Sequence, residues 1–297
     1  MPVGTPLKDS GARAADQPRP SSEALDRAVG VVGTNAVETY RPTVSGRAFL
    51  CVSVLLFAAS AAGTVVWCGS MSMRDMPMPG GGTMSMAWMR MPGQTWAGAA
   101  ASFLAMWAVM MVAMMLPSLI PMLWRYRQAV GNEARLGLLT AFVGVGYYFV
   151  WTAFGMAALP LGFALATVEM QQPALARVVP IAVGVVVLVA GCLQRTAWKA
   201  RHLACCREAP GMGRTLTADA GTAWRHGLRL GLHCCQCCAG LIGILLVIGV
   251  MDLRAMVIVT AAMTAERLAP AGERVARATG AVVVVAGLLL IARASGL

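Results

Sequence analysis

The chain is built around long apolar segments that contain no Asp, Glu, Lys or Arg. Seven such segments occur, at residues 48–67, 97–123, 136–168, 178–194, 230–251, 255–265 and 278–292. About 20 apolar residues, at about 1.5 Å each, cross the hydrocarbon core of a bilayer as a helix. The pattern therefore predicts an all-α fold, a polytopic transmembrane helix bundle of about seven spans.

The sixth segment, residues 255–265, is the weakest of the seven. Its eleven residues cover only about 16 Å by helical rise, whereas the hydrocarbon core is about 30 Å thick. It crosses the membrane only if the helix continues through Glu266 and Arg267 towards Pro270.

Composition agrees with this pattern and divides the chain in two. The chain is 58% hydrophobic and 12% charged, whereas soluble domains are about 25% charged, so a soluble fold is excluded. Residues 1–47 are rich in Gly, Pro, Ser and Ala and have no apolar period, which predicts a disordered cytoplasmic tail. Residues 48–297 then form the transmembrane domain. The first apolar segment starts too late and is too long for a cleaved signal peptide.

The net charge of +11 is explained by membrane topology rather than by nucleic acid. Nineteen of the 24 Lys and Arg residues lie before the first segment or in the second, fourth and sixth connections, and five lie elsewhere. Cytoplasmic loops carry such an excess, so the N-terminus is predicted in the cytoplasm and the C-terminus outside. The sequence has no basic stripe with interleaved aromatic residues, the pattern that would indicate nucleic-acid binding.

Sulfur is the unusual chemistry of the chain, with nine Cys and 21 Met against 13 carboxylates. The outer loop, residues 68–96, contains a duplicated methionine motif with the same spacing in each copy. Its members are Met71, Met73, Met76, Met78, Met84, Met86, Met89 and Met91. Gly, Pro and Ser interrupt the motif, which argues against Met as a filler of a hydrophobic core. Thioethers are soft, neutral ligands that suit Cu(I), so the motif predicts capture of a soft metal.

The second apolar segment has a methionine face. Met106, Met110 and Met114 are spaced by four residues, and Met111 and Met115 lie on the adjacent ridge. This face is either a pathway for a soft ion or a packing surface between helices, because Met serves both purposes.

Glu266 is an ionisable group close to an apolar segment, where charge is costly. It is either a functional group for proton or cation balance or a partner of Arg267 or Arg274 at the membrane surface.

A cluster of thiols and imidazoles is predicted at the cytoplasmic side. Its members are Cys234, Cys237 and Cys238 on one helical face, His233 beside them, and His202, Cys205 and Cys206 in the connection 195–229. Cytoplasmic cysteines stay reduced, and such clusters more often bind metal than form disulfides. The donors suit Cu(I), zinc or an iron–sulfur centre. A redox dithiol and small buried hydrophobic residues are the alternatives.

Three motifs resemble a known family. They are Met106-Trp107-x-x-Met110-x-x-Ala113-Met114-Met115-x-Pro117-Ser118, Gly231-x-x-Cys234-x-x-Cys237-Cys238 and Ala265-Glu266-Arg267-Leu268-Ala269-Pro270. Together they are similar to a bacterial domain of unknown function described as a predicted metal-binding integral membrane protein. The resemblance covers about residues 97–292 and implies metal binding in the bacterial cytoplasmic membrane.

The chain departs from this family's pattern near the cysteines. His202 stands where the pattern has Cys, and Cys205 is an additional cysteine. Leu230 stands where the pattern has His, and Ala239 where it has Trp. The methionine duplication lies outside the pattern.

The sequence favours a protein that handles a soft metal, most of all Cu(I). The outer methionine repeat captures the ion, the methionine face offers a path, and the inner cluster receives or senses it. The expected partners are membrane lipid, the metal ion, and a copper enzyme or chaperone. No catalytic or phosphate-binding signature is visible, so we expect neither an enzyme nor an active pump.

Two other functions remain open. One is a membrane thiol oxidoreductase. Such an enzyme usually passes electrons to a second dithiol across the membrane, and the outer side offers only Cys68, which counts against this function. The other is a metal-responsive sensor or an assembly factor for a copper enzyme.

Overall fold

The computed structural model describes residues 44–72, 76–77, 83–84, 93–131, 134–172, 178–207 and 219–296. Almost all of the expected tail at residues 1–47 lies outside these residues. So do five methionines of the outer repeat, namely Met73, Met78, Met86, Met89 and Met91.

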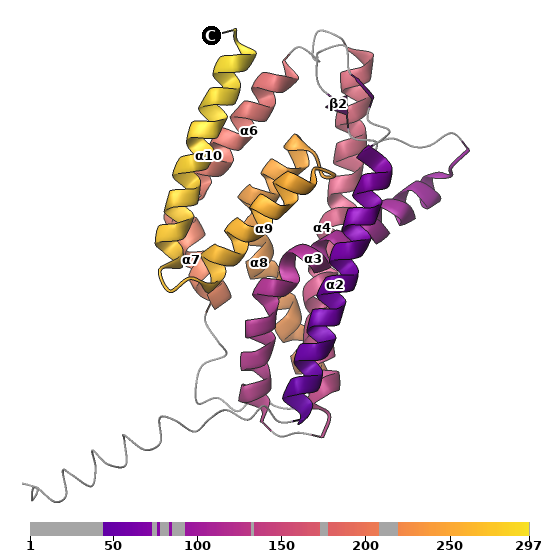
Figure 1. Ribbon diagram of the computed structural model, residues 1–297, viewed down its shortest axis with the longest axis vertical. Coiled ribbons are helices and arrows are strands. Elements are labelled where there is room, and N and C mark those ends of the chain that lie inside the picture. Colours follow the sequence, from indigo (N-terminus) through magenta and orange to yellow (C-terminus); the bar gives the residue numbers. More distant parts are fainter. Residues whose placement is uncertain are drawn as a thin grey trace, which may run out of the picture. The chain divides into compact units, whose positions relative to one another are not determined.

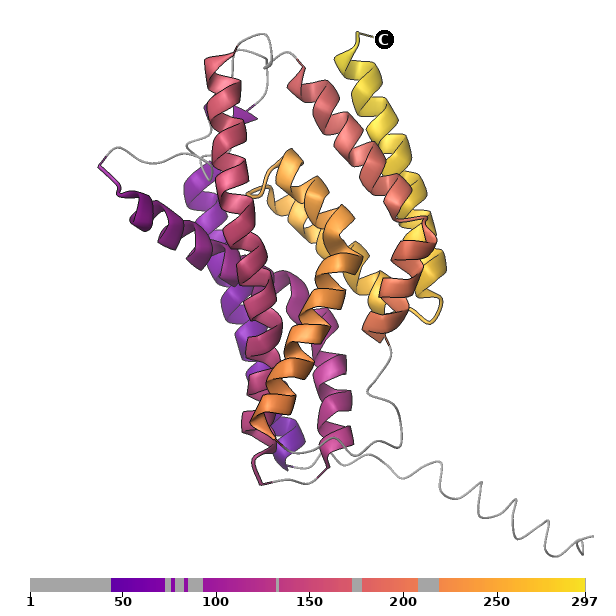
Figure 2. The same cartoon turned by 180° about the vertical axis from the view of Figure 1, so that it is seen from behind.

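The described residues form an all-α fold with one very short strand pair, as Figures 1 and 2 show. The helices are α2 (Val44–Ser72), α3 (Trp96–Val130), α4 (Leu136–Gln171), α6 (Val179–Leu193), α7 (Ala197–Arg207), α8 (Ala220–Ile248), α9 (Leu253–Leu268) and α10 (Gly272–Ala294). The predicted fold class is therefore confirmed as helical.

The strand pair joins the two copies of the methionine motif. β1 (Met76–Pro77) pairs antiparallel with β2 (Thr83–Met84), and Met76 lies opposite Met84. Met71 falls in the last turn of α2. The backbone thus brings one methionine of each quartet into the same ladder.

Five of the described helices are long and apolar enough to cross a membrane, which are α2, α3, α4, α8 and α10. A sixth span results if α6 and α7, bent by 65° relative to each other, count as one. The seventh predicted span is α9, which continues through Glu266 and Arg267 to Leu268. Its 16 residues extend about 24 Å, so the count of seven stays a prediction.

Hydrogen-bonding caps explain where several helices begin. The Thr95 side chain accepts from the Gly98 amide at the start of α3, and Asp219 accepts from the Thr222 amide at the start of α8. Asp252 accepts from the Arg254 and Ala255 amides and starts α9. Between α8 and α9, Gly249 has φ +143°, a backbone conformation that residues with a side chain strongly disfavour. The apolar run 230–265 therefore folds as two helices.

Glycines allow two close helix pairs, as small residues do in membrane proteins. α8 packs against α4 through Gly227 and Gly231, and α6 packs against α10 through glycines of both helices. α2 begins at one end of the helical domain, and α10 ends at the opposite end (Figures 1 and 2).

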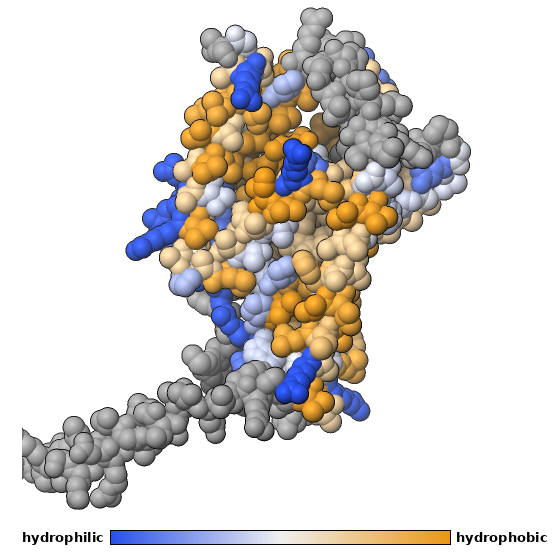
Figure 3. All heavy atoms as spheres, in the orientation of Figure 1, coloured by the Kyte–Doolittle hydropathy of each residue, from blue (hydrophilic) through white to orange (hydrophobic). Residues whose placement is uncertain are grey.

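The surface of the helical domain is apolar over wide areas (Figure 3). Large exposed hydrophobic side chains occur on most helices, for example Leu55, Val145 and Val282. A lipid environment accommodates such a surface, whereas water does not.

The α4–α8 contact makes a specific prediction at Gly227. A Cβ atom there would overlap the backbone carbonyl of Val143, whereas a Cβ at Gly243 on the same helix meets nothing within 4 Å. Gly227→Ala is expected to destabilise the protein by about 1–3 kcal/mol, the usual range for overpacking, measured as thermal unfolding in detergent micelles. Gly243→Ala is the matched control and should be neutral or slightly stabilising. Equal stability of the two variants would contradict the packing of α4 on α8.

Candidate metal centre

Three thiols of α8 meet inside the protein. The sulfur atoms of Cys234, Cys237 and Cys238 all lie within 4.8 Å of one another. Cys237 and Cys238 are 3.5 Å apart and Cys234 and Cys238 3.9 Å apart, and each side chain is at most 1% exposed. The three cysteines therefore share one face of α8, as their spacing predicts, and this face points into the interior of the protein.

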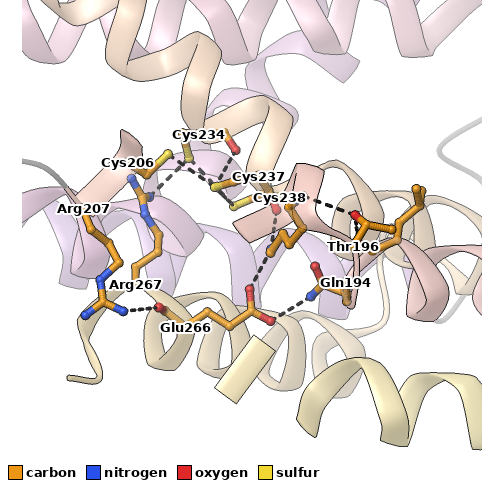
Figure 4. A network of polar contacts seen from close by, with 11 residues as sticks. Gln194, Thr196, Cys206, Arg207, Cys234, Cys237, Cys238, Glu266 and Arg267 are labelled. Atoms are coloured by element: carbon orange, nitrogen blue, oxygen red, sulfur yellow. Dashed lines mark hydrogen bonds and ion pairs between the residues drawn. The ribbon is translucent and has the colours of Figure 1, made fainter. Parts of the chain in front are cut away.

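A fourth thiol reaches this group from α7. The bend after α6 lays α7 against α8, and Cys206 Sγ lies 3.5 Å from Cys237 Sγ (Figure 4). Cys206 is buried, whereas its neighbour Cys205 is exposed. The predicted connection thus contributes one buried thiol, and we call Cys206, Cys234, Cys237 and Cys238 the thiol cluster.

The methionine face of α3 ends at the thiol cluster. Met115 Sδ is 4.0 Å from Cys234 Sγ. The other members of this face, Met106, Met110, Met111 and Met114, are all buried in the same hydrophobic core. Burial alone fits both packing and a pathway, and the Met115 contact links this face to the thiols at one point.

A buried guanidinium lies beside the thiol cluster. Arg267 of α9 donates to Cys234 Sγ at 3.2 Å, to Ser118 Oγ at 2.8 Å and to Met122 Sδ at 3.3 Å. The Tyr147 hydroxyl lies 2.9 Å from Cys234 Sγ. Arg267 is 4% exposed. A cation in this position stabilises the negative charge of a thiolate at Cys234.

Glu266 pairs with a lysine that lies far away in the sequence. Lys199 Nζ is 2.7 Å from Glu266 Oε2, and Gln194 Nε2 donates to Glu266 Oε1 at 2.7 Å. Lys199 also donates to the backbone carbonyl of Cys237. Glu266 is therefore buried and paired with Lys199, and pairing with Arg267 or Arg274 at the surface is wrong.

Sequence reasoning missed Lys199, Arg267 and Tyr147 as parts of this site. Lys199 and Arg267 stand next to apolar segments, where an ionisable group is a functional candidate by default. The rule that makes Glu266 a functional candidate applies equally to Lys199 and Arg267, so it could have identified both cations.

Two histidines flank the thiol cluster. The rings of His202 and His233 have centroids 6.1 Å apart, and each Nδ1 atom is buried without a hydrogen-bond partner. His202 precedes Cys206 by one helical turn, and His233 precedes Cys237 by one turn.

The donors of this site determine which ions fit it. Four thiols and a thioether are soft ligands, which suit Cu(I), zinc or iron–sulfur centres and suit Mg²⁺ or Ca²⁺ poorly. Glu266, the carboxylate nearest to the thiols in Figure 4, is already taken by Lys199 and Gln194. The residues therefore fit a soft metal ion.

A family model described as "PpoB2: Copper chaperone" matches residues 104–290. The chain belongs to this copper chaperone family. The matched region contains the thiol cluster, Arg267, the Lys199–Glu266 pair and the whole methionine face. This agrees with the metal-binding bacterial family that the sequence resembles over about residues 97–292. No curated protein and no solved structure matches the chain.

The buried ion pair of Lys199 and Glu266 makes a prediction about stability. Lys199→Met leaves Glu266 as an uncompensated buried charge, which costs about 3–5 kcal/mol. The double variant Lys199→Met/Glu266→Gln removes both charges and should recover much of that loss. Thermal unfolding in detergent measures both.

The exposed pair Glu273–Arg277 is the matched control, with side chains 54% and 64% exposed. Removing Arg277 there should cost no more than about 1 kcal/mol. A Lys199→Met variant as stable as the Arg277→Met variant would contradict the paired burial of Lys199 and Glu266.

Proposed function

We propose that this protein is a membrane copper chaperone that carries Cu(I) as its cargo and binds it at the thiol cluster. The observation that carries the proposal is the burial of four thiols from two helices beside one guanidinium. Membership of a copper chaperone family supports copper as the metal.

Charge favours Cu(I) over the other soft metals at this site. Cu(I) bound by two thiolates carries one negative charge, which the positive charge of Arg267 offsets. Lys199 and Glu266 already neutralise each other. Zinc takes four ligands in structural sites, and with four thiolates it would carry two negative charges. Because uncompensated charge is costly in a buried site, the Cu(I) complex suits this surrounding best.

The methionines supply a route to the cluster. The outer repeat, with Met71, Met76 and Met84 among its eight members, captures the ion as a thioether complex. The ion then passes along the buried face from Met106 through Met110, Met111 and Met114 to Met115, which contacts Cys234. Donors that change from thioether to thiol along this route favour movement towards the cluster.

The orientation follows from the charges of the loops. Lys and Arg are in excess before the first span and in the second, fourth and sixth connections between spans, which favours a cytoplasmic position for these parts. The opposite positions of the start of α2 and the end of α10 support an odd number of crossings. The protein is thus a multi-pass protein of the bacterial cytoplasmic membrane, with the methionine repeat outside and the thiol cluster towards the cytoplasm.

His202 and His233 serve release of the ion. Their unpartnered Nδ1 atoms lie one turn from Cys206 and Cys237, so they offer an intermediate pair of ligands between the cluster and a partner. Cys205, exposed on the same helix, is available to that partner. The partner is a copper enzyme or a second copper chaperone.

A membrane thiol oxidoreductase is less well supported. The thiols of the cluster are close enough to form disulfides, but an oxidoreductase needs a second dithiol to pass electrons across the membrane. Among the described residues, Cys68 has a methionine as its sulfur neighbour and not a second cysteine.

Replacement of the thiols of α8 tests the proposed function. The variant Cys234→Ala/Cys237→Ala/Cys238→Ala of the full chain should lose its tightest Cu(I) equivalent, with affinity falling at least about 100-fold because the ligands are gone. The measurement is competition against bathocuproine disulfonate in detergent.

Cys51→Ala/Cys192→Ala is the matched control, since both thiols are exposed and lie outside the thiol cluster, and it should keep the tight site. Unchanged Cu(I) affinity of the triple variant would place the metal elsewhere and refute the proposal.

A further inference from the structure

A second group of sulfur atoms lies away from the thiol cluster. Cys68, in the last turns of α2, points to Met251 in the turn between α8 and α9, with Cys68 Sγ 3.7 Å from Met251 Sδ. Cys68 is 3% exposed and Met251 8% exposed. Two residues 183 positions apart thus bring a thiol and a thioether together in the interior.

A small cavity adjoins these two sulfur atoms. Its volume is about 10 Å³, and its lining consists of Thr64, Trp67, Cys68, Met106, Val109, Met110 and Met251. This is the space of about one water molecule, so it suits a single ion and no larger ligand. One thiol and three thioethers face it.

The lining excludes water and hard cations. A buried water needs two to four polar partners, whereas the hydroxyl of Thr64 already donates to the carbonyl of Ser60. No carboxylate or imidazole lines the cavity, so Mg²⁺, Ca²⁺ or Zn²⁺ would meet few of their preferred ligands. A soft monovalent ion finds its preferred ligands there.

We infer that Cys68, Met251, Met106 and Met110 form a second Cu(I) site, separate from the thiol cluster. The inference rests on the proposed function and names an intermediate binding site on its route.

Met106 and Met110 belong to both the cavity and the methionine face. Met115, at the thiol cluster, lies about 13 Å farther along α3 than Met106. Cys68 stands three residues before Met71, the first methionine of the outer repeat. The site therefore joins the repeat to the buried face.

The charge of this second site agrees with its surroundings. Cu(I) with one thiolate and neutral thioethers is electrically neutral, and no charged residue lines the cavity. The thiol cluster provides more thiolates and has Arg267 as its counter-ion. Each site thus has the counter-charge that its own thiolates require, which lets the same ion occupy either one without leaving a net charge buried.

The test is a Cu(I) titration of the full chain in detergent, with bathocuproine disulfonate as competitor. Cys68→Ala/Met251→Leu should bind one Cu(I) equivalent fewer than the natural sequence, because the thiolate and one of the three thioethers that line the cavity are gone. Cys51→Ala/Met156→Leu is the matched control, because Cys51 is exposed on the same helix and Met156 is exposed on α4. The control should bind as many equivalents as the natural sequence. If the double variant does not fold, Cys68→Ala alone carries the same comparison.

The triple variant at Cys234, Cys237 and Cys238 separates this inference from the proposed function. It should lose the equivalent of the thiol cluster and keep the equivalent at Cys68. An unchanged count and affinity in Cys68→Ala/Met251→Leu, together with a loss in the triple variant, would overturn the second site and leave the proposed function standing. No loss in the triple variant would overturn the proposed function itself.

Discussion

The burial of Arg267 beside the thiol of Cys234 is the interaction on which the site depends. A guanidinium in a protein interior needs partners for its donors and a negative charge nearby. Its Nη1 and Nη2 atoms donate to Ser118 and Met122 on α3 and to Cys234 on α8, whereas its Nε atom is buried without a hydrogen-bond partner. These contacts fix how α3, α8 and α9 lie against one another around the thiols. The guanidinium also offsets the negative charge that a metal-bound thiolate would bring to this buried site.

The buried ion pair of Lys199 and Glu266 contributes no net charge beside the thiols. Lys199 and Glu266 neutralise each other and connect α7 to α9, and Lys199 also holds the backbone of Cys237. Arg267 is the cation that donates a hydrogen bond to the thiol of Cys234 (Figure 4). A monovalent ion on two thiolates completes this balance. Electrostatics therefore explains why the soft ligands of this site lie beside Arg267 and the Lys199–Glu266 pair.

The sequence predicts features that follow from local spacing. Apolar length predicts the long helices, and the spacing of Cys234, Cys237 and Cys238 predicts their common face, because both depend on helical geometry within one segment. The contact between Cys206 and Cys237 and the pairing of Glu266 with Lys199 depend instead on the 65° bend before α7 and on packing between distant helices. A single sequence carries no such distances. Its position marks Glu266 as a costly charge and leaves open a functional role or a surface pair with Arg267 or Arg274, but it does not indicate Lys199.

X-ray absorption at the copper K edge tests the central claim most directly. The full chain loaded with one equivalent of Cu(I) should show a first coordination shell of sulfur atoms only, as thiolates beside a guanidinium require. A shell made up mainly of nitrogen or oxygen atoms would contradict the thiol cluster as the place where the ion is held.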